Sequence, residues 1–174
     1  MKRVALWAPL ALVLLIALVV AATLLRPAER AQRSRLVGRP VPAFATPPLQ
    51  PDRPGLASTE LQGGPRLLNL FASWCVPCIA EAPSLLELER RGVRIDGIAV
   101  RDEAGAVADF LRRHGDPFAA IGDDRQSRAQ LALGSSGVPE SFVVDAQGVI
   151  RHHHLGPIMP QDLSTILQAI ERAR

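Results

Sequence analysis

Two cysteines, Cys75 and Cys78, stand between a short apolar run and an amphipathic segment. Residues 66–72 (RLLNLFA) suit a buried central strand, and residues 76–91 have the pattern of a helix that ends at Gly92. The cysteines therefore open the helix, where free backbone N–H groups and the helix dipole favour a thiolate over a thiol. Because one turn brings the two sulfurs into bonding range, we predict that Cys75 attacks a disulfide and that Cys78, the less exposed thiol, resolves the mixed disulfide.

The remainder of the chain alternates strand and helix patterns. We expect strands at residues 93–100 and 118–121, helices at 104–114 and 126–133, a hairpin of strands at 141–145 and 149–153, and a terminal amphipathic helix at 160–173. This order predicts an α/β fold, with a mixed sheet covered by helices on both faces. On the helix expected at residues 76–91, the spacing predicts that Ile79 faces the core and Glu81 the solvent.

An apolar run of 22 residues, of which 20 are apolar and none is charged, occupies residues 4–25. As a helix it would rise about 33 Å, enough to cross a hydrocarbon core of about 30 Å. It predicts an uncleaved, single-pass anchor in membrane lipid, within a segment that covers residues 1–25. A cleaved signal peptide is the alternative, but its apolar region would have only about 7–15 residues. We expect a basic stalk at residues 26–39 and one domain at 40–174.

The basic residues that make the net charge of the chain +3 are in excess only in its N-terminal part. Residues 40–174 contain 13 arginines and 16 acidic residues, so the predicted domain has a charge of −3. Such a domain lacks the basic charge that is typical of nucleic-acid binding, and we predict no nucleic-acid partner. Basic residues beside an apolar helix fit anionic lipid headgroups better.

A proline far along the chain from the cysteines is a further candidate for the site. Val138 and Pro139 precede the strand at 141–145, and a proline at the start of a strand is compatible with a cis peptide bond. A cis-proline loop would place the Val138 backbone beside the sulfurs, ready to pair with an extended substrate. An ordinary proline at the start of a strand is the alternative.

Other interpretations of the cysteines are a zinc half-site and a structural disulfide. Zinc needs four ligands, or three and a water, and the chain has no second cysteine pair. A disulfide that closes so short a loop stabilises least. His152, His153 and His154 resemble a metal cluster, but only His152 and His154 share a strand face, so we predict no metal site.

Residues 36–174 resemble the thioredoxin-like fold. The features that carry the resemblance are the apolar strand, the Trp74–Cys78 motif (WCVPC), Pro83 and Pro139. Further segments resemble the CcmG/DsbE family, the membrane-anchored thiol–disulfide oxidoreductases of cytochrome c maturation; they are residues 38–44, 101–102, 115–118, 137–140 and 154–157. The chain departs from the family at residues 134–137, which read Gly-Ser-Ser-Gly where the family often has Gly-Val-Tyr-Gly.

This resemblance implies a reductant that uses no cofactor other than the redox-active Cys75–Cys78 disulfide. The implied substrate is apocytochrome c, whose reduced thiols then take haem. The implied electron donor is a membrane thiol transporter of the DsbD/CcdA type. The resemblance also implies a location in the bacterial inner membrane, with the domain in the periplasm. The expected substrate-binding residues are Trp74, Val76, Pro77, Val138 and Pro139.

Thiol exchange benefits from a group that moves protons. Many thioredoxin-like proteins have a carboxylate six residues before the first cysteine, but this chain has Asn69 there. Glu81 and Glu140 are therefore our candidates for proton transfer. The alternative functions are a TlpA-like reductant for copper-site maturation and a metallochaperone that uses the two cysteines and the histidines at 152–154.

Overall fold

The computed structural model describes residues 12–13, 15 and 36–174. The chain divides into two units, Met1–Arg33 and Ser34–Arg174. A search of the described residues finds no helix with both the length and the apolar character needed to span a membrane. Most of the predicted anchor and most of the predicted stalk lie outside the described residues, so both stay predictions.

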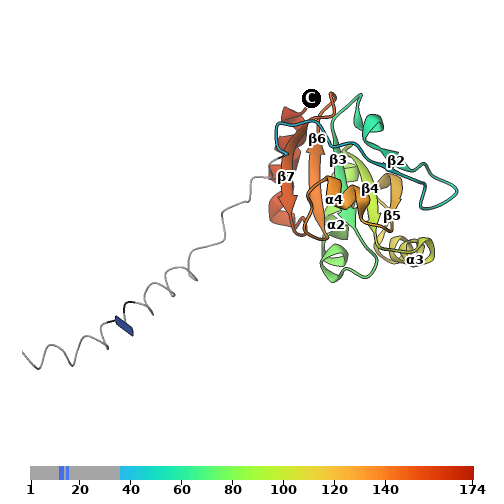
Figure 1. The fold of residues 1–174 in the computed structure, drawn as a ribbon, viewed down its shortest axis with the longest axis horizontal. Helices are drawn as coiled ribbons and strands as arrows, with labels where there is room; N and C mark the ends of the chain where they lie inside the picture. The colour runs from blue at the N-terminus through green and yellow to red at the C-terminus, as the bar shows by residue number, and fades with distance from the viewer. Residues whose placement is uncertain (1–11, 14, 16–35) are drawn as a thin grey trace, which may run out of the picture. The chain divides into compact units, whose positions relative to one another are not determined.

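The second unit is built on a five-stranded mixed sheet with the strand order β5-β4-β3-β6-β7 (Figure 1). Strands β3, β4 and β5 are parallel, and β6 and β7 run antiparallel to their neighbours. The strands are β3 (Arg66–Phe71), β4 (Arg94–Val100), β5 (Phe118–Asp124), β6 (Glu140–Val144) and β7 (Ile150–Leu155). All residues of β3 and β6 are buried, as expected for strands at the centre of a covered sheet.

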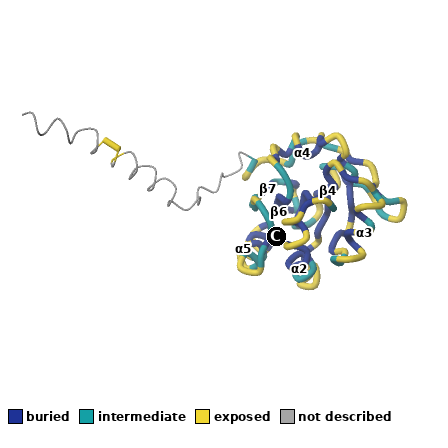
Figure 2. The backbone as a smooth tube through the Cα atoms, turned by 90° about the horizontal axis from the view of Figure 1, so that it is seen from below, coloured by how far each residue is buried: buried dark blue, intermediate teal, exposed yellow. Residues whose placement is uncertain are grey.

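Helices and short segments cover both faces of this sheet. They are η1 (Ser58–Leu61), α2 (Val76–Arg90), α3 (Ala104–His114), α4 (Arg128–Ala132), η2 (Pro160–Asp162) and α5 (Leu163–Arg172). One core cluster joins the sheet to α2, α3 and α5, and a second joins its other face to η1 and α4. Figure 2 shows the buried strands enclosed by helices with exposed outer sides. The predicted α/β architecture is confirmed, and it is thioredoxin-like.

A small hairpin in the proline-rich stretch was not predicted. Strands β1 (Ala45–Thr46) and β2 (Leu56–Ala57) pair antiparallel, and the segment between them lies along β5, where Leu49 N donates to Ile121 O at 3.2 Å. A Cβ atom at Gly122 would lie only 1.9 Å from Thr46 Oγ1, so glycine is needed for this close approach. The segment covers the outer edge of β5, a strand that pairs with β4 as far as Asp124, beyond the expected end at 121.

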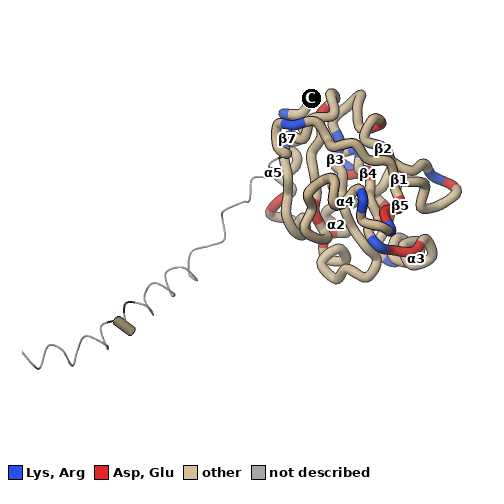
Figure 3. Tube along the Cα trace, in the orientation of Figure 1, with Lys and Arg blue, Asp and Glu red and all other residues tan. Residues whose placement is uncertain are grey.

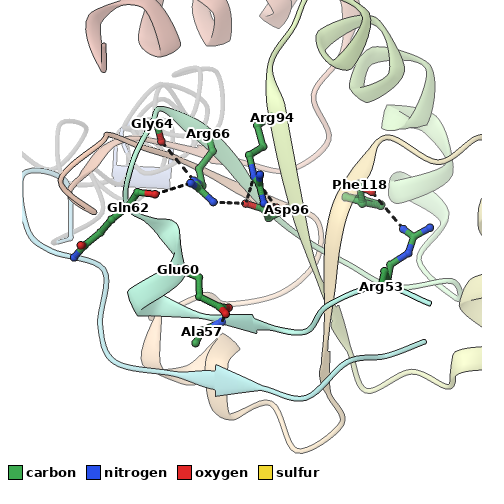
Figure 4. Close-up of polar contacts among 9 residues, drawn as sticks. All are labelled: Arg53, Ala57, Glu60, Gln62, Gly64, Arg66, Arg94, Asp96 and Phe118. Carbon is green, nitrogen blue, oxygen red and sulfur yellow. Dashed lines mark hydrogen bonds and ion pairs between the residues drawn. The ribbon is translucent and has the colours of Figure 1, made fainter. Parts of the chain in front are cut away.

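Acidic and basic residues are interspersed along the chain of the domain (Figure 3). One ion pair among them is buried. Figure 4 shows Asp96 of β4 between Arg66 and Arg94, at the end of the sheet where β3 and β4 begin. The same view shows Glu60, whose carboxylate accepts a hydrogen bond from Ala57 N at 2.8 Å and so fixes the start of η1.

Candidate active site

The two cysteines form a disulfide at the start of α2, with Cα atoms 5.3 Å apart. Cys75 is the N-cap residue, and its Sγ accepts a hydrogen bond from Cys78 N at 3.2 Å. This donor and the helix dipole would stabilise a Cys75 thiolate after reduction. Cys75 keeps 3% of its surface exposed and Cys78 1%, so both are nearly covered in the disulfide form.

Exposed apolar side chains flank the disulfide. Trp74 and Val76 are 57% and 74% exposed, and both were predicted to contact substrate. The Trp74 indole is oriented by a hydrogen bond from Nε1 to Arg101 O at 3.2 Å. Arg101 has φ +49°, a conformation that is uncommon for a residue other than glycine, and its Nε donates to Ser127 Oγ at 2.7 Å.

Asp102 fixes the turn before Trp74, because its carboxylate accepts hydrogen bonds from both the backbone N and the Oγ of Ser73. Residues 101 and 102 were noted in the sequence only as a family motif. The contribution of Ser73 and Ser127 was missed, and no local pattern marks it.

The predicted solvent exposure of Glu81 is wrong, because its side chain is fully buried. The loop after β7 covers that side of α2, and Ile158 N in this loop donates to Glu81 Oε2 at 3.0 Å. Asn69 Nδ2 donates to the other carboxylate oxygen at 3.1 Å. The expected position of Ile79 in the core is also wrong, because this side chain is 38% exposed.

Burial raises the pKa of Glu81 from 4.5 to about 7, against the opposing hydrogen bonds from Ile158 and Asn69. A cavity of about 10 Å³, roughly the space that one water requires, is lined by Cys78, Glu81 and seven further residues. The asparagine that stands in place of the usual strand carboxylate thus hydrogen-bonds to a carboxylate on the helix, which lines this cavity together with Cys78.

The raised pKa predicts a pH-dependent stability. The proton is bound more tightly in the folded chain, so the stabilisation is fully present below about pH 4.5 and is lost as the pH rises through about 7. We expect this group to lower the free energy of unfolding by about 3 kcal/mol across that range. Denaturant titrations at several pH values should show the decline in the natural chain and not in a Glu81→Gln variant.

The exposed Glu89 on the same helix offers a matched control, because a Glu89→Gln variant should keep the pH dependence of the natural chain. An unchanged pH dependence in Glu81→Gln would contradict the assignment of this titration to Glu81.

The loop before β6 contains the second predicted part of the site. The Val138–Pro139 peptide bond is cis, which decides between the two interpretations of Pro139. Val138 packs against the core cluster that contains both cysteines, so the loop lies at the end of the sheet where α2 begins. Pro77 lies in the first turn of α2. The structure thus brings the five predicted substrate-binding residues to one end of the domain.

Glu140 differs from Glu81 in its electrostatics. Burial favours its neutral form, but hydrogen bonds from His153 and Ser136 outweigh burial, and the pKa of Glu140 is lowered. It is therefore held as a carboxylate, a state that suits an anchor better than a proton carrier. Of the two candidates for proton transfer, only Glu81 has a pKa near neutrality.

Neighbouring histidines of β7 make different contacts, as expected for side chains on opposite faces of a strand. His153 contacts Glu140, whereas His154 Nε2 lies 3.3 Å from Pro157 O. Burial, with the neighbouring His154, His153 and Arg172, lowers the pKa of His152. Among the described residues, no group of three or more His, Cys, Asp or Glu side chains is placed to hold a metal ion.

A disulfide at the start of a helix, on a five-stranded mixed sheet and near a cis-proline loop, defines a thioredoxin-like thiol–disulfide oxidoreductase. The Redoxin family model matches residues 36–170. The thiol:disulfide interchange protein DsbE of Pseudomonas fluorescens is 40% identical over 159 residues, covering 91% of this chain and 88% of that protein. The DsbE homologue of Paracoccus denitrificans is 38% identical over 86% of this chain and 84% of its own length.

Solved structures agree with this comparison. A thioredoxin family thiol:disulfide interchange protein of Chlorobium tepidum matches with a TM-score of 0.61 at 26% identity, over 77% of this chain and 94% of its own. A secreted disulfide oxidoreductase of Mycobacterium tuberculosis shares the fold, with a TM-score of 0.62 at 23% identity, over 75% and 96%. The chain belongs to the DsbE family of thiol:disulfide interchange proteins.

Proposed function

We propose that this oxidoreductase reduces the disulfide of apocytochrome c before haem attachment, in the periplasm and anchored in the inner membrane through residues 4–25. The observation that carries the proposal is the Cys75–Cys78 pair at the start of α2, with Glu81 buried beside it. The apolar run near the N-terminus and the DsbE relatives support it. Periplasmic thiols face an oxidising compartment, so a reductant there needs a continuous supply of electrons.

The reaction would proceed in two exchanges. The Cys75 thiolate attacks one sulfur of the substrate disulfide, the substrate S–S bond breaks, and one substrate sulfur leaves as a thiolate. Cys78 then loses its proton to Glu81 and attacks Cys75 Sγ, which releases the second substrate thiolate and leaves the Cys75–Cys78 disulfide. Glu81 suits this role because its pKa of about 7 lets it accept a proton near neutral pH.

Two electrons thus pass from the protein to the substrate. A membrane dithiol of the DsbD/CcdA type would return them by the reverse exchange with the Cys75–Cys78 disulfide. Neither exchange requires a cofactor, because the sulfur atoms carry both electrons.

Replacement of Cys78 by serine is expected to stop the reaction at the mixed disulfide, because no second thiol can release the substrate. The trapped partner can be isolated from cells under non-reducing conditions and identified by mass spectrometry. Apocytochrome c bound through Cys75 is the expected result. A Cys75→Ser/Cys78→Ser variant is the matched control and should trap nothing. Recovery of a copper-site protein instead would favour the TlpA-like alternative.

A further inference from the structure

We propose that His153 and Ser136 are positioning residues that clamp Glu140 and thereby hold the cis-proline loop (residues 134–139) in shape for a peptide disulfide. The inference rests on the oxidoreductase activity, and it does not depend on whether the natural substrate is apocytochrome c.

Three hydrogen bonds hold the Glu140 carboxylate. Oε1 accepts from Ser136 N at 3.0 Å and from Ser136 Oγ at 2.9 Å, and Oε2 lies 3.0 Å from His153 Nε2. Glu140 is only 3% exposed, so water offers little replacement for these donors. Loss of a hydrogen-bond donor to a buried carboxylate costs free energy, and the three contacts therefore fix the position of Glu140.

His153 is itself held rigidly on β7. Its ring stacks on Phe142 of β6, with centroids 4.1 Å apart and planes inclined by 12°, and the two residues are opposite each other in the sheet. The His153 side chain is 6% exposed. His153 Nδ1 is buried and has no hydrogen-bond partner among the described residues, so Nε2 is the ring nitrogen that donates to Glu140.

The clamp acts on the loop through chain connectivity. Glu140 follows Pro139 directly, and the Ser136 contacts close residues 136–140 into a ring. Two more bonds brace the loop: Ser135 Oγ donates to Gly137 O at 2.8 Å, and Gly156 N donates to Pro139 O at 3.1 Å. A loop that is already ordered spares a peptide the cost of ordering it on binding. Ser136 stands where the family often has tyrosine, so this donor is a feature of the present chain.

The test compares two substrates of different size. One is a synthetic peptide with an intramolecular Cys-x-x-Cys disulfide, and the other is 2-hydroxyethyl disulfide, which offers no peptide backbone to the loop. In His153→Phe, which keeps the ring stack but lacks the donor, we expect KM for the peptide to rise about tenfold, as for the loss of one hydrogen bond to a charged group. We expect kcat with the peptide and the rate constant with 2-hydroxyethyl disulfide to change less than twofold.

Ser136→Ala should raise the same KM several-fold, and His153→Gln, which restores a donor, should recover part of the loss. His154→Phe on the same strand is the control and should behave as the natural chain. An unchanged KM in both His153→Phe and Ser136→Ala, or equal losses with both substrates, would overturn the proposal. If His153→Phe does not fold, Ser136→Ala decides alone, because Ser136 lies on the exposed side of the loop. Trapping by Cys78→Ser is a separate readout, so failure of either proposal can be told from failure of the other.

Discussion

Replacing Asp96 with alanine is expected to lower the free energy of unfolding by about 3–5 kcal/mol, as for a buried ion pair that loses one partner. Asp96 Oδ2 accepts from Arg66 Nη1 at 3.0 Å, and the two side chains are 0% and 7% exposed. The Arg66 guanidinium also donates to Gln62 O at 2.8 Å and cannot turn toward solvent without breaking that bond. Without Asp96, its charge would remain buried and uncompensated.

A double-mutant cycle with Arg66→Met separates the pair from its surroundings. We expect the double variant Arg66→Met/Asp96→Ala to lose less stability than Asp96→Ala, because it leaves no unpaired charge. Arg94→Met is the control for the exposed partner, whose Nε lies 3.4 Å from Asp96 Oδ1 and whose side chain is 53% exposed; it should change stability by about 1 kcal/mol or less. Denaturant titration of the full-length chain and of each variant would provide the free energies of unfolding. A loss below about 1 kcal/mol in Asp96→Ala would contradict the expected effect.

Local pattern was sufficient to predict most of the architecture. Hydrophobic period and chain reversal are local properties of a sequence, so short segments predict single elements. Examples are the apolar runs at β3 and β4, the glycines that end α2 and α3, and the turn Ala146-Gln147-Gly148 between β6 and β7. The helix at Ala104–His114 was predicted at its observed bounds. The β1–β2 hairpin was missed, because the segment between its strands is held by backbone hydrogen bonds to β5, about 70 residues along the chain, and its prolines mask any strand pattern.

The sequence predicted a site residue correctly only where its place at the end of a strand or helix was enough to locate it. The cysteines and Pro139 were located from the strand and helix next to them, whereas Glu81 was placed on the wrong side of α2. Helical period assigns a residue to a face, but the loop that contains Ile158 decides whether that face is covered. The contact between Glu140 and His153 crosses two strands, and only the pairing register of β6 with β7 brings them together.

Replacing Cys75 with alanine is expected to reduce the rate of disulfide reduction to the uncatalysed background. Cys75 caps α2, where the Cys78 N–H and the helix dipole favour its thiolate, and Cys78 is the more deeply buried of the two. In Cys75→Ala the remaining thiol would also lie beside Glu81, whose negative charge above about pH 7 disfavours a second anion. Stopped-flow measurement of the reduction of a peptide disulfide by the pre-reduced protein would test this.

Cys75→Ala and Cys78→Ala should therefore differ in the rate at which they form a mixed disulfide. Cys78→Ala should retain the first exchange and form a mixed disulfide at a rate close to that of the natural chain, whereas Cys75→Ala should form none. Both variants should remain folded, because a disulfide between residues three apart closes too short a loop to contribute much stability. If Cys75→Ala and Cys78→Ala formed mixed disulfides at equal rates, the attacking thiol would not be fixed by its position at the helix N-terminus. If only Cys75→Ala formed one, the roles of the two cysteines would be reversed.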